Sequence, residues 1–370
     1  MQLQLLRRCA RPKIIFTEDL KTWGQVGNTM AEKRIVRVTS FDVAEAAGVS
    51  QSTVSRALAG DTSISEPTRK RVNEAALRLN YQVDENAARL RRGRTGTLAL
   101  VMICRPGQDR KDLNPFYFAL LGSTCAAAAA RGYEVLVAFQ DSTDNFWGRY
   151  QERRKADGMI VIGTSENTAA WDYFGTLGDG NNWVCWGAPS DAFPWVRSDN
   201  HAGAMLATRH MLVRGYKAIV CLGSETSPQR QFKERFDGYA SAMRDAGLEP
   251  FMQRIERGLE REEQGRRAVV ALIESGRPFD AIFGVSDEIA LGALKELCTR
   301  GYRVPDDIGV VGFDGVRAGA WSNPQLTTVE SDFEVAGSLL VDRLIATIGG
   351  EAPSPQRVPV RLIVRGSTRT

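Results

Sequence analysis

The stretch "TSFDVAEAAGVSQSTVSRALAG", which runs from Thr39 to Gly60, contains two short helical patterns on either side of a glycine. Thr39 stands where the first helix needs an N-cap. Asp42 follows three positions later, and each side chain can satisfy a backbone N–H that lacks a helical partner. Gly48 allows a sharp turn, and Ser50 is the N-cap candidate of the next helix. We therefore expect two short helices joined by a tight turn.

Each helical pattern carries a small apolar face that repeats at helical spacing. The inward positions are Val43, Ala44 and Ala47, then Val54, Ala57 and Leu58, then Val72, Ala75, Ala76 and Leu79 in a third helix from Ser65, with Thr68 in its capping turn. Two short helices around a glycine turn, braced by a third, form a helix-turn-helix unit. The alternative is an ordinary three-helix bundle with a solvated face, and the agreement of caps, glycine and apolar spacing disfavours it.

The second helix leaves Gln51, Ser52, Ser55 and Arg56 facing outward. These side chains are small enough to enter the major groove of DNA and can read base edges there. Glutamine pairs with adenine, arginine pairs bidentately with guanine, and the serine hydroxyl can hydrogen-bond to the edges of several bases. This face therefore predicts sequence-specific contact with double-stranded DNA.

Charge along the chain is uneven, although the formal net charge is only +4 over 370 residues. Residues 33–94 contain 12 Lys and Arg against 7 Asp and Glu, whereas residues 95–370 contain 31 against 34. Positive charge is thus concentrated in a short N-terminal module, as expected of a part that meets a polyanion.

Composition also disfavours several classes of protein. No apolar run approaches the length of about 18 residues that a membrane span needs, and the opening "MQLQLLRRCARPKIIF" lacks the apolar core of a signal peptide. Six scattered cysteines without a CxxC pair are typical of reduced thiols in a cytoplasmic protein. With only two histidines, His201 and His210, we expect no metal site and no catalytic triad; no cofactor motif is present either.

From Thr97 onward, buried-strand runs such as "TLALVMI", "ADGMIVIG", "KAIVCLG" and "GVVGF" alternate with helical patterns. This alternation predicts parallel doubly wound sheets, and about ten units suggest two similar subdomains. Ligands in such sheets lie at the carboxyl ends of the strands. The side chains expected at or near these ends are Asn114, Phe116, Trp186, Arg235, Ser286, Asp287, Asp314 and Trp321.

A sugar-like ligand suits this set, because it needs bidentate donors, carboxylate acceptors and a flat apolar face. Arg235 would open the helix "RFDGY", and Asp314 would follow "GVVGF". The alternatives stay open: Arg235 and Asp314 can form a structural ion pair, and Trp186 and Trp321 can pack in the core.

Residues 38–97 closely resemble the headpiece of the lac repressor/galactose repressor family. The resemblance implies that Gln51, Ser52 and Arg56 read bases. It implies that Thr39, Thr53, Ser65 and Thr68 bind phosphate. The full DNA-contact set that we expect is Thr39, Ser50, Gln51, Ser52, Thr53, Arg56, Ser65, Thr68, Tyr81 and Leu90.

The next segment, "DENAARLRRGRTG", resembles the hinge of that family. The resemblance implies that it folds only where two copies meet in the minor groove, with Leu90 wedged into a base step. Val83-Asp84 stands where the family usually has Pro-Asn, so the hinge entry is less rigid and Asp84 is the candidate N-cap. A plain flexible linker is the alternative reading.

Residues 97–370 resemble the effector domain of the family, itself similar to periplasmic sugar-binding proteins, through "NPFY", "SDNHAG", "RFDGY", "SDEIALGAL", "GFDG" and "PQLTTV". Ser286 replaces a common asparagine. The resemblance implies a transcriptional regulator that acts as a repressor and is not an enzyme. It would bind a pseudo-palindromic operator and a small effector, with a carbohydrate expected. Without a terminal heptad repeat, a homodimer is expected.

The predicted fold is an all-α helix-turn-helix headpiece followed by an α/β periplasmic-binding-protein-like domain of two doubly wound parallel-sheet subdomains. The expected boundaries are an extension over 1–35, a headpiece over 36–82, a hinge over 83–96 and an effector and dimerisation domain over 97–370. Within the last, the N-subdomain is expected over about 97–196 and 327–355, and the C-subdomain over 197–326 and 356–370. A transport-type binding protein and a nucleotide-dependent enzyme are the competing functions. The missing export signal and the missing GxGxxG and P-loop motifs disfavour them.

Overall fold

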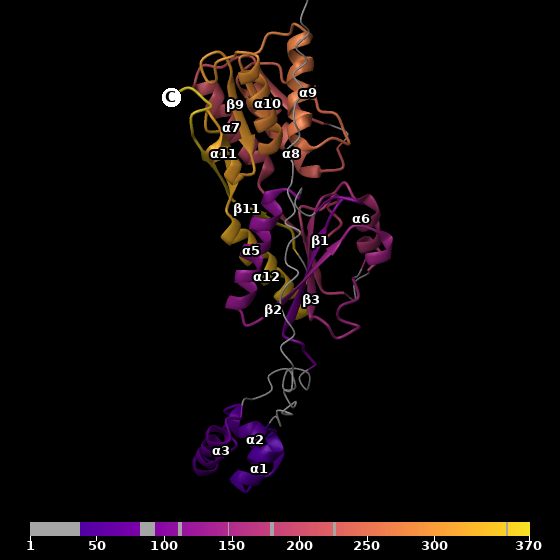
Figure 1. The fold of residues 1–370 in the computed structure, drawn as a ribbon, viewed down its shortest axis with the longest axis vertical. Coiled ribbons are helices and arrows are strands. Elements are labelled where there is room, and N and C mark those ends of the chain that lie inside the picture. The colour runs from indigo at the N-terminus through magenta and orange to yellow at the C-terminus, as the bar shows by residue number, and fades with distance from the viewer. Residues whose placement is uncertain are drawn as a thin grey trace, which may run out of the picture. The chain divides into compact units, whose positions relative to one another are not determined.

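The computed structural model describes residues 38–81, 93–109, 113–146, 148–177, 181–224, 227–352 and 354–370. The chain forms two compact units, Met1–Asp84 and Glu85–Thr370, which we call the headpiece and the body (Figure 1). The predicted extension over 1–35 and most of the hinge, including Leu90, lie outside the described residues. Within the described part of the chain, no helix is long and apolar enough to cross a bilayer.

The headpiece consists of helices α1 (Ser40–Ala47), α2 (Gln51–Leu58) and α3 (Glu66–Arg78). Its core contains the predicted inward positions, since Val43, Ala44, Ala47, Val54, Ala57, Val72, Ala75 and Ala76 are buried and Leu58, Leu79 and Tyr81 pack against them. The predicted three-helix arrangement is therefore confirmed.

Local capping contacts define the two short helices. The Asp42 carboxylate accepts hydrogen bonds from the Thr39 backbone N–H at 2.7 Å and from the Thr39 hydroxyl at 2.8 Å. Gly48 adopts a φ of 64°, the left-handed conformation that ends α1. The Ser50 hydroxyl then accepts from the Thr53 N–H and begins α2. Each of these roles was predicted from the sequence.

The first sheet of the body has the order β11-β5-β4-β3-β1-β2, and all its strands are parallel. The strands are β1 (Thr97–Ile103), β2 (Glu134–Gln140), β3 (Gly158–Gly163), β4 (Trp183–Trp186), β5 (Trp195–Ser198) and β11 (Gln356–Val358). Helices α5 (Pro115–Ala130) and α12 (Phe333–Ile348) lie side by side on one face, although they are far apart in the sequence (Figure 1). Helix α6 (Thr168–Gly175) packs on the other face.

Successive side chains of β1 point to opposite faces of the sheet, so this one strand contributes to the helix packing on both faces. Leu98, Leu100 and Met102 pack in the cluster that contains α5 and α12. Ala99 and Val101 point to the opposite face, toward the aromatic side chains of α6. Because both faces are covered, the strand is apolar throughout, as expected of a parallel sheet.

The second sheet has the order β12-β10-β9-β8-β6-β7 and is parallel except for β12, which runs antiparallel to β10. Its strands are β6 (Ile219–Gly223), β7 (Phe251–Arg254), β8 (Ala281–Gly284), β9 (Gly309–Phe313), β10 (Thr327–Ser331) and β12 (Val360–Ile363). Its helices are α7 (Asn200–Val213), α8 (Arg230–Asp245), α9 (Arg261–Glu274), α10 (Asp287–Thr299) and α11 (Arg317–Trp321). The two sheets with their helices are the first and second subdomains.

The chain passes between the subdomains later than predicted. Residues 327–331 were expected in the N-subdomain, but they form β10 of the second sheet, paired with β9. Residues 356–358 were expected in the C-subdomain, but they form β11 of the first sheet, paired with β5. Strands of three to five residues leave little periodicity in the sequence, which is why the boundaries at 327 and 356 need correction.

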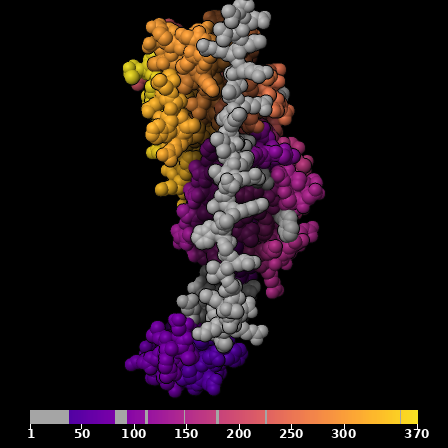
Figure 2. Space-filling view, viewed as in Figure 1, coloured from indigo at the N-terminus to yellow at the C-terminus, as the bar shows by residue number. Residues whose placement is uncertain are grey.

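Three crossover segments join the subdomains and are hydrogen-bonded to one another. The hydroxyls of Ser198 and Ser331 are 2.6 Å apart, and the Asp199 N–H donates to the Val358 carbonyl at 2.9 Å. The Asp332 N–H donates to the Pro359 carbonyl at 3.4 Å. In Figure 2 the second subdomain (orange to yellow) lies against the first (purple to magenta).

Candidate functional site

The outward face of α2 presents the predicted base-reading side chains. Ser52 and Arg56 are exposed, whereas Gln51 is half-buried and donates its amide N–H to the Ser40 hydroxyl at 3.0 Å. The Ser50 hydroxyl lies 2.9 Å from that of Ser52 and 2.8 Å from that of Thr53. α2 therefore begins with a cluster of hydroxyls and ends with an exposed guanidinium.

The predicted phosphate-binding side chains lie at helix N-termini. Thr39 precedes α1 and is exposed, and the Ser65 hydroxyl before α3 donates to that of Thr68 at 3.0 Å. Backbone N–H groups and hydroxyls at such ends favour phosphate oxygens. Tyr81 is half-buried against the headpiece core, where the tyrosine also stabilises the module.

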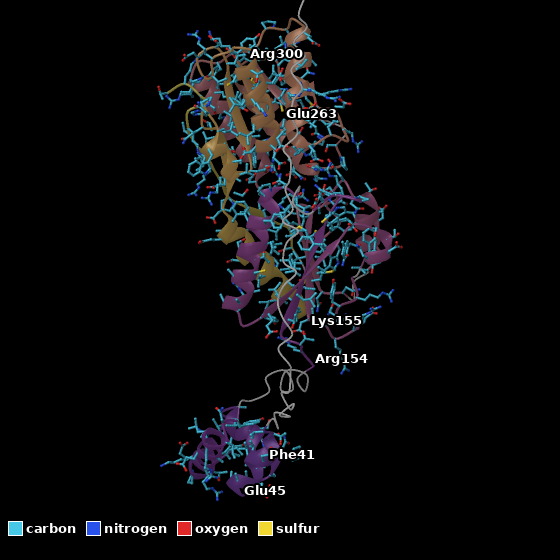
Figure 3. All side chains as sticks on the ribbon, viewed as in Figure 1. Phe41, Glu45, Arg154, Lys155, Glu263 and Arg300 are labelled. Atoms are coloured by element: carbon cyan, nitrogen blue, oxygen red, sulfur yellow. The ribbon has the colours of Figure 1, made fainter. Side chains whose placement is uncertain are left out.

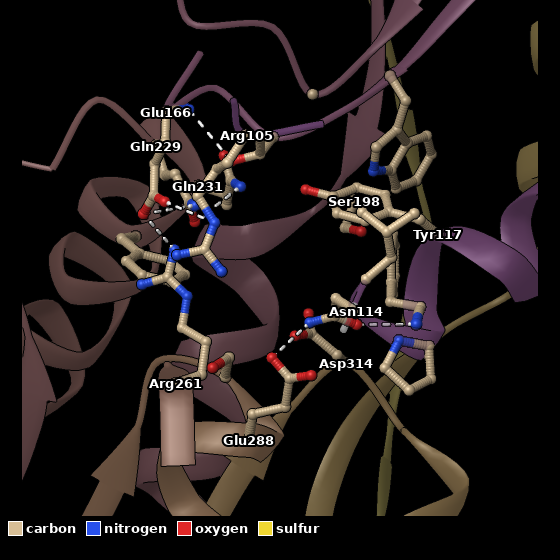
Figure 4. A pocket seen from close by; sticks show the side chains of 18 of the residues that line it. Arg105, Asn114, Tyr117, Glu166, Ser198, Gln229, Gln231, Arg261, Glu288 and Asp314 are labelled. Atoms are coloured by element: carbon tan, nitrogen blue, oxygen red, sulfur yellow. Dashed lines mark hydrogen bonds and ion pairs between the residues drawn. The ribbon is translucent and has the colours of Figure 1, made fainter. Parts of the chain in front are cut away.

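A cavity of about 330 Å³ lies in the body, lined by residues of both subdomains (Figure 4). Six of the eight predicted effector residues line it: Asn114, Phe116, Trp186, Arg235, Ser286 and Asp314. The Phe116 and Trp186 rings are 5.7 Å apart, and both belong to the core cluster that contains α5 and α12. The cavity thus combines an aromatic wall with polar groups at strand ends.

Arg235 and Asp314 form a buried ion pair, with Nη2 and Oδ1 2.9 Å apart. The same guanidinium donates from Nε to Asn200 Oδ1 at 2.9 Å and from Nη1 to the Val285 carbonyl at 2.6 Å. Burial raises the pKa of Asp314, and the Arg235 charge opposes this shift. The structural ion pair left open by the sequence is therefore present, at the wall of the cavity. Helix α8 begins at Arg230, so Arg235 lies in its second turn rather than opening it.

Asn114 connects the two subdomains. Its side-chain oxygen accepts from the Phe116 N–H at 2.8 Å and caps α5. Its Nδ2 donates to Glu288 Oε2 of α10 at 2.9 Å (Figure 4). Glu288 was not predicted. Burial and the nearby charges of Glu262 and Asp314 raise the pKa of Glu288 to about 8.

Asp287 and Trp321 do not line the cavity, which corrects two of the predicted effector contacts. Asp287 is fully buried and accepts from the Thr328 hydroxyl and, at 2.7 Å, from the Val316 N–H. Burial raises the pKa of Asp287 to about 7. Trp321 is 79% exposed at the end of α11, eight residues beyond β9, so its ring is neither in the core nor in the cavity.

Four further charged side chains join the subdomains across the cavity, and sequence reasoning missed them. Arg105, directly beyond β1, contacts Glu260 at 3.1 Å, and Arg261 contacts Glu166 at 2.6 Å (Figure 4). Arg105 and Glu166 are 3.7 Å apart. Two of them could have been found from the sequence. Arg105 and Glu166 come shortly after the carboxyl ends of β1 and β3, which is where ligands bind in parallel α/β sheets.

Comparisons with known proteins agree with both units. Residues 41–84 match the family model of bacterial regulatory proteins, lacI family, and residues 208–368 match that of a periplasmic binding protein-like domain. Over 351 residues the chain is 30% identical to the HTH-type transcriptional repressor CytR of Escherichia coli (strain K12), covering 92% of this chain and 98% of that protein. The chain belongs to the lacI family.

Other members of the lacI family are similar over the same length. The regulator CelR of Thermobifida fusca is 29% identical over 341 residues, covering 90% of this chain and 98% of that one. A solved CelR–cellobiose complex has a TM-score of 0.64 at 27% identity, covering 90% of this chain and 100% of that one. The lac repressor dimer bound to operator and an anti-inducer shares the fold, with a TM-score of 0.71 at 24% identity and the same coverage.

Membership of the lacI family confirms the predicted fold class and the predicted kind of protein. The chain is a DNA-binding transcriptional regulator with an effector-binding domain, and it is not an enzyme.

Proposed function

We propose that a homodimer of this chain represses transcription from a pseudo-palindromic operator and that a small molecule in the body cavity controls its affinity. The observation that supports this most strongly is the cavity itself, which lies between two subdomains joined by three adjacent crossovers. A ligand that binds one angle between the subdomains better than another shifts the equilibrium between them. Five free cysteines among the described residues support the proposed cytoplasmic location.

The effector that we propose is a carbohydrate-like molecule. The aromatic wall of Phe116 and Trp186 offers a flat apolar surface, and the Asn114 and Ser286 side chains offer hydrogen bonds. Among the similar structures, CelR was solved with cellobiose, which supports the same class of ligand here.

A thermal-shift screen against sugars and nucleosides, followed by measurement of operator binding with each hit, tests the proposed class of effector. The effector should both raise Tm and change operator affinity; if every stabilising compound leaves operator affinity unchanged, the proposed control is wrong.

We further propose that Gln51, Ser52 and Arg56 read bases and that Ser50, Thr39, Thr53, Ser65, Thr68 and Tyr81 position the headpiece on phosphates. Their placement on α2 and at helix N-termini supports these roles. The wedge role of Leu90 stays a prediction.

Operator binding is expected to weaken steeply with salt. Each phosphate contact releases counterions and contributes about −0.9 to the slope of log K against log salt concentration. Fluorescence anisotropy with a labelled fragment of the chain's own promoter, titrated at several salt concentrations, measures this slope. A flat response would contradict the proposed phosphate contacts.

Arg56→Ala is expected to cost about 1–3 kcal/mol on the specific operator and much less on random DNA, because a bidentate base contact is lost. The matched control is Arg78→Ala, which removes an equal charge from α3 and should leave the ratio of specific to random affinity unchanged. Equal losses on both DNAs for Arg56→Ala would show that Arg56 contacts only phosphate.

A further inference from the structure

A short basic turn lies on the surface of the first subdomain, between β2 and β3. We define the basic turn as residues 149–155, "RYQERRK". Arg149, Arg153, Arg154 and Lys155 are exposed, and the acidic Glu152 among them lies 3.6 Å from Arg149. Four positive charges against one negative charge stand out on a body in which acidic residues outnumber basic ones.

The basic turn is held rigidly by the fold. Tyr150 is buried, and its hydroxyl accepts from the Gln140 amide at 3.3 Å. The Lys155 N–H donates to the Tyr150 carbonyl at 2.9 Å, and the Gln151 side chain accepts from the Asn182 N–H at 2.6 Å. The cationic side chains are therefore presented from a fixed backbone, which reduces the entropy lost when they bind a partner.

Arg154 occupies a backbone conformation that normally selects glycine. Its φ of 51° lies in the left-handed region. The Arg154 N–H donates to the Gln151 carbonyl at 2.8 Å and closes the turn that ends at this residue. An arginine there costs about 1 kcal/mol relative to glycine. The chain thus keeps a positive charge where the backbone alone favours a residue without a side chain.

The basic turn lies next to the point where the chain enters the body from the headpiece. Asp157, two residues beyond the turn, accepts hydrogen bonds from the Gly96 N–H at 3.0 Å and from the Thr95 hydroxyl at 2.8 Å. In Figure 3, Arg154 and Lys155 lie at the end of the body farthest from Arg300. The headpiece precedes Thr95 in the chain, so the basic turn lies beside the point at which the DNA-binding module is attached to the body.

We propose that the basic turn binds backbone phosphates of the operator DNA, so that the body adds a sequence-independent contact to those of the headpiece. The proposal rests on the proposed function, since DNA is the polyanion concerned. Lysine and arginine on a fixed surface attract phosphate without reading sequence. In a two-fold symmetric dimer, the two copies of the turn would face symmetry-related positions on the duplex.

The test is a double variant, Arg154→Gly with Lys155→Gln. The glycine removes the charge and also relieves the left-handed backbone, so the fold is retained; circular dichroism and Tm check this. Operator affinity is measured at several salt concentrations on two duplexes. One ends at the operator, and the other extends one helical turn beyond it at each end. On the extended duplex the variant should bind roughly tenfold more weakly at physiological salt, with a salt slope shallower by about two to four.

The matched control is Arg300→Gln with Arg303→Gln, which removes the same charge from another surface segment of the body. Arg300 lies at the opposite end of the body from Arg154 (Figure 3). This control should keep the wild-type slope on both duplexes. The proposal is overturned if the basic-turn variant keeps the wild-type slope and affinity, or if the control loses as much, because net charge alone would then explain the effect. Failure of the proposed function is distinguishable, since the wild-type protein would then bind neither duplex.

Discussion

Arg235→Leu is expected to destabilise the body by about 3–5 kcal/mol and to abolish the response to the effector. The substitution leaves the Asp314 carboxylate buried without its cationic partner and leaves the Val285 carbonyl and the Asn200 side chain without a donor. Because the guanidinium also lies 3.7 Å above the Phe313 ring, its removal opens space beside the core of the second subdomain. Urea denaturation followed by fluorescence measures the loss of stability.

A second variant separates stability from ligand binding. Arg235→Leu combined with Asp314→Asn removes both charges, so most of the lost stability should return, while the effector response stays absent. If Arg235→Leu alone is as stable as the wild-type protein, the buried pair does not have the energetic role assigned to it. If the double variant still responds to the effector, neither side chain contacts the ligand.

Gly292→Ala is expected to destabilise the second subdomain by about 3 kcal/mol or more. A Cβ at Gly292 in α10 would overlap the Glu262 carbonyl of α9, and a Cβ at Gly265 in α9 would overlap the Ile289 carbonyl of α10. The two helices therefore approach each other through backbone atoms at both glycines. Since no side chain can rotate out of the way, the helices must separate.

The same substitution at Gly122 provides the control. Gly122 is an exposed position inside α5 where a Cβ would meet nothing within 4 Å. Gly122→Ala should therefore stabilise the protein by up to about 1 kcal/mol, through helix propensity alone. Thermal unfolding of the two variants should shift Tm in opposite directions. A neutral Gly292→Ala would contradict the close helix contact.

The headpiece was predictable because its determinants are local. Thr39, Asp42, Gly48 and Ser50 act on backbone groups within a few residues of themselves, so their roles can be read from spacing alone. The general position of the cavity was predictable for a related reason: strand ends can be found from apolar runs, and parallel strands end at the same edge of a sheet.

Which individual side chains line the cavity was less predictable, because this depends on the direction in which each side chain points from its helix. Ser286, Asp287 and Glu288 all follow β8, but successive residues of a helix point about 100° apart. Ser286 and Glu288 reach the cavity, while Asp287 points to Thr328 of β10, two strands away from β8 in the sheet. Which of the three faces inward depends on how α10 is rotated on the sheet, and that is set by distant packing such as the Gly292 contact.

The three crossovers between the subdomains determine what kind of signal the effector can send. Bonds such as Ser198–Ser331 and Asp199–Val358 keep these segments together as a single pivot, and Ser198 of this pivot also lines the cavity. Twisting or sliding one lobe over the other would break the pivot, whereas tilting preserves it. We therefore expect a ligand in the cavity to act by changing the tilt angle between the two subdomains.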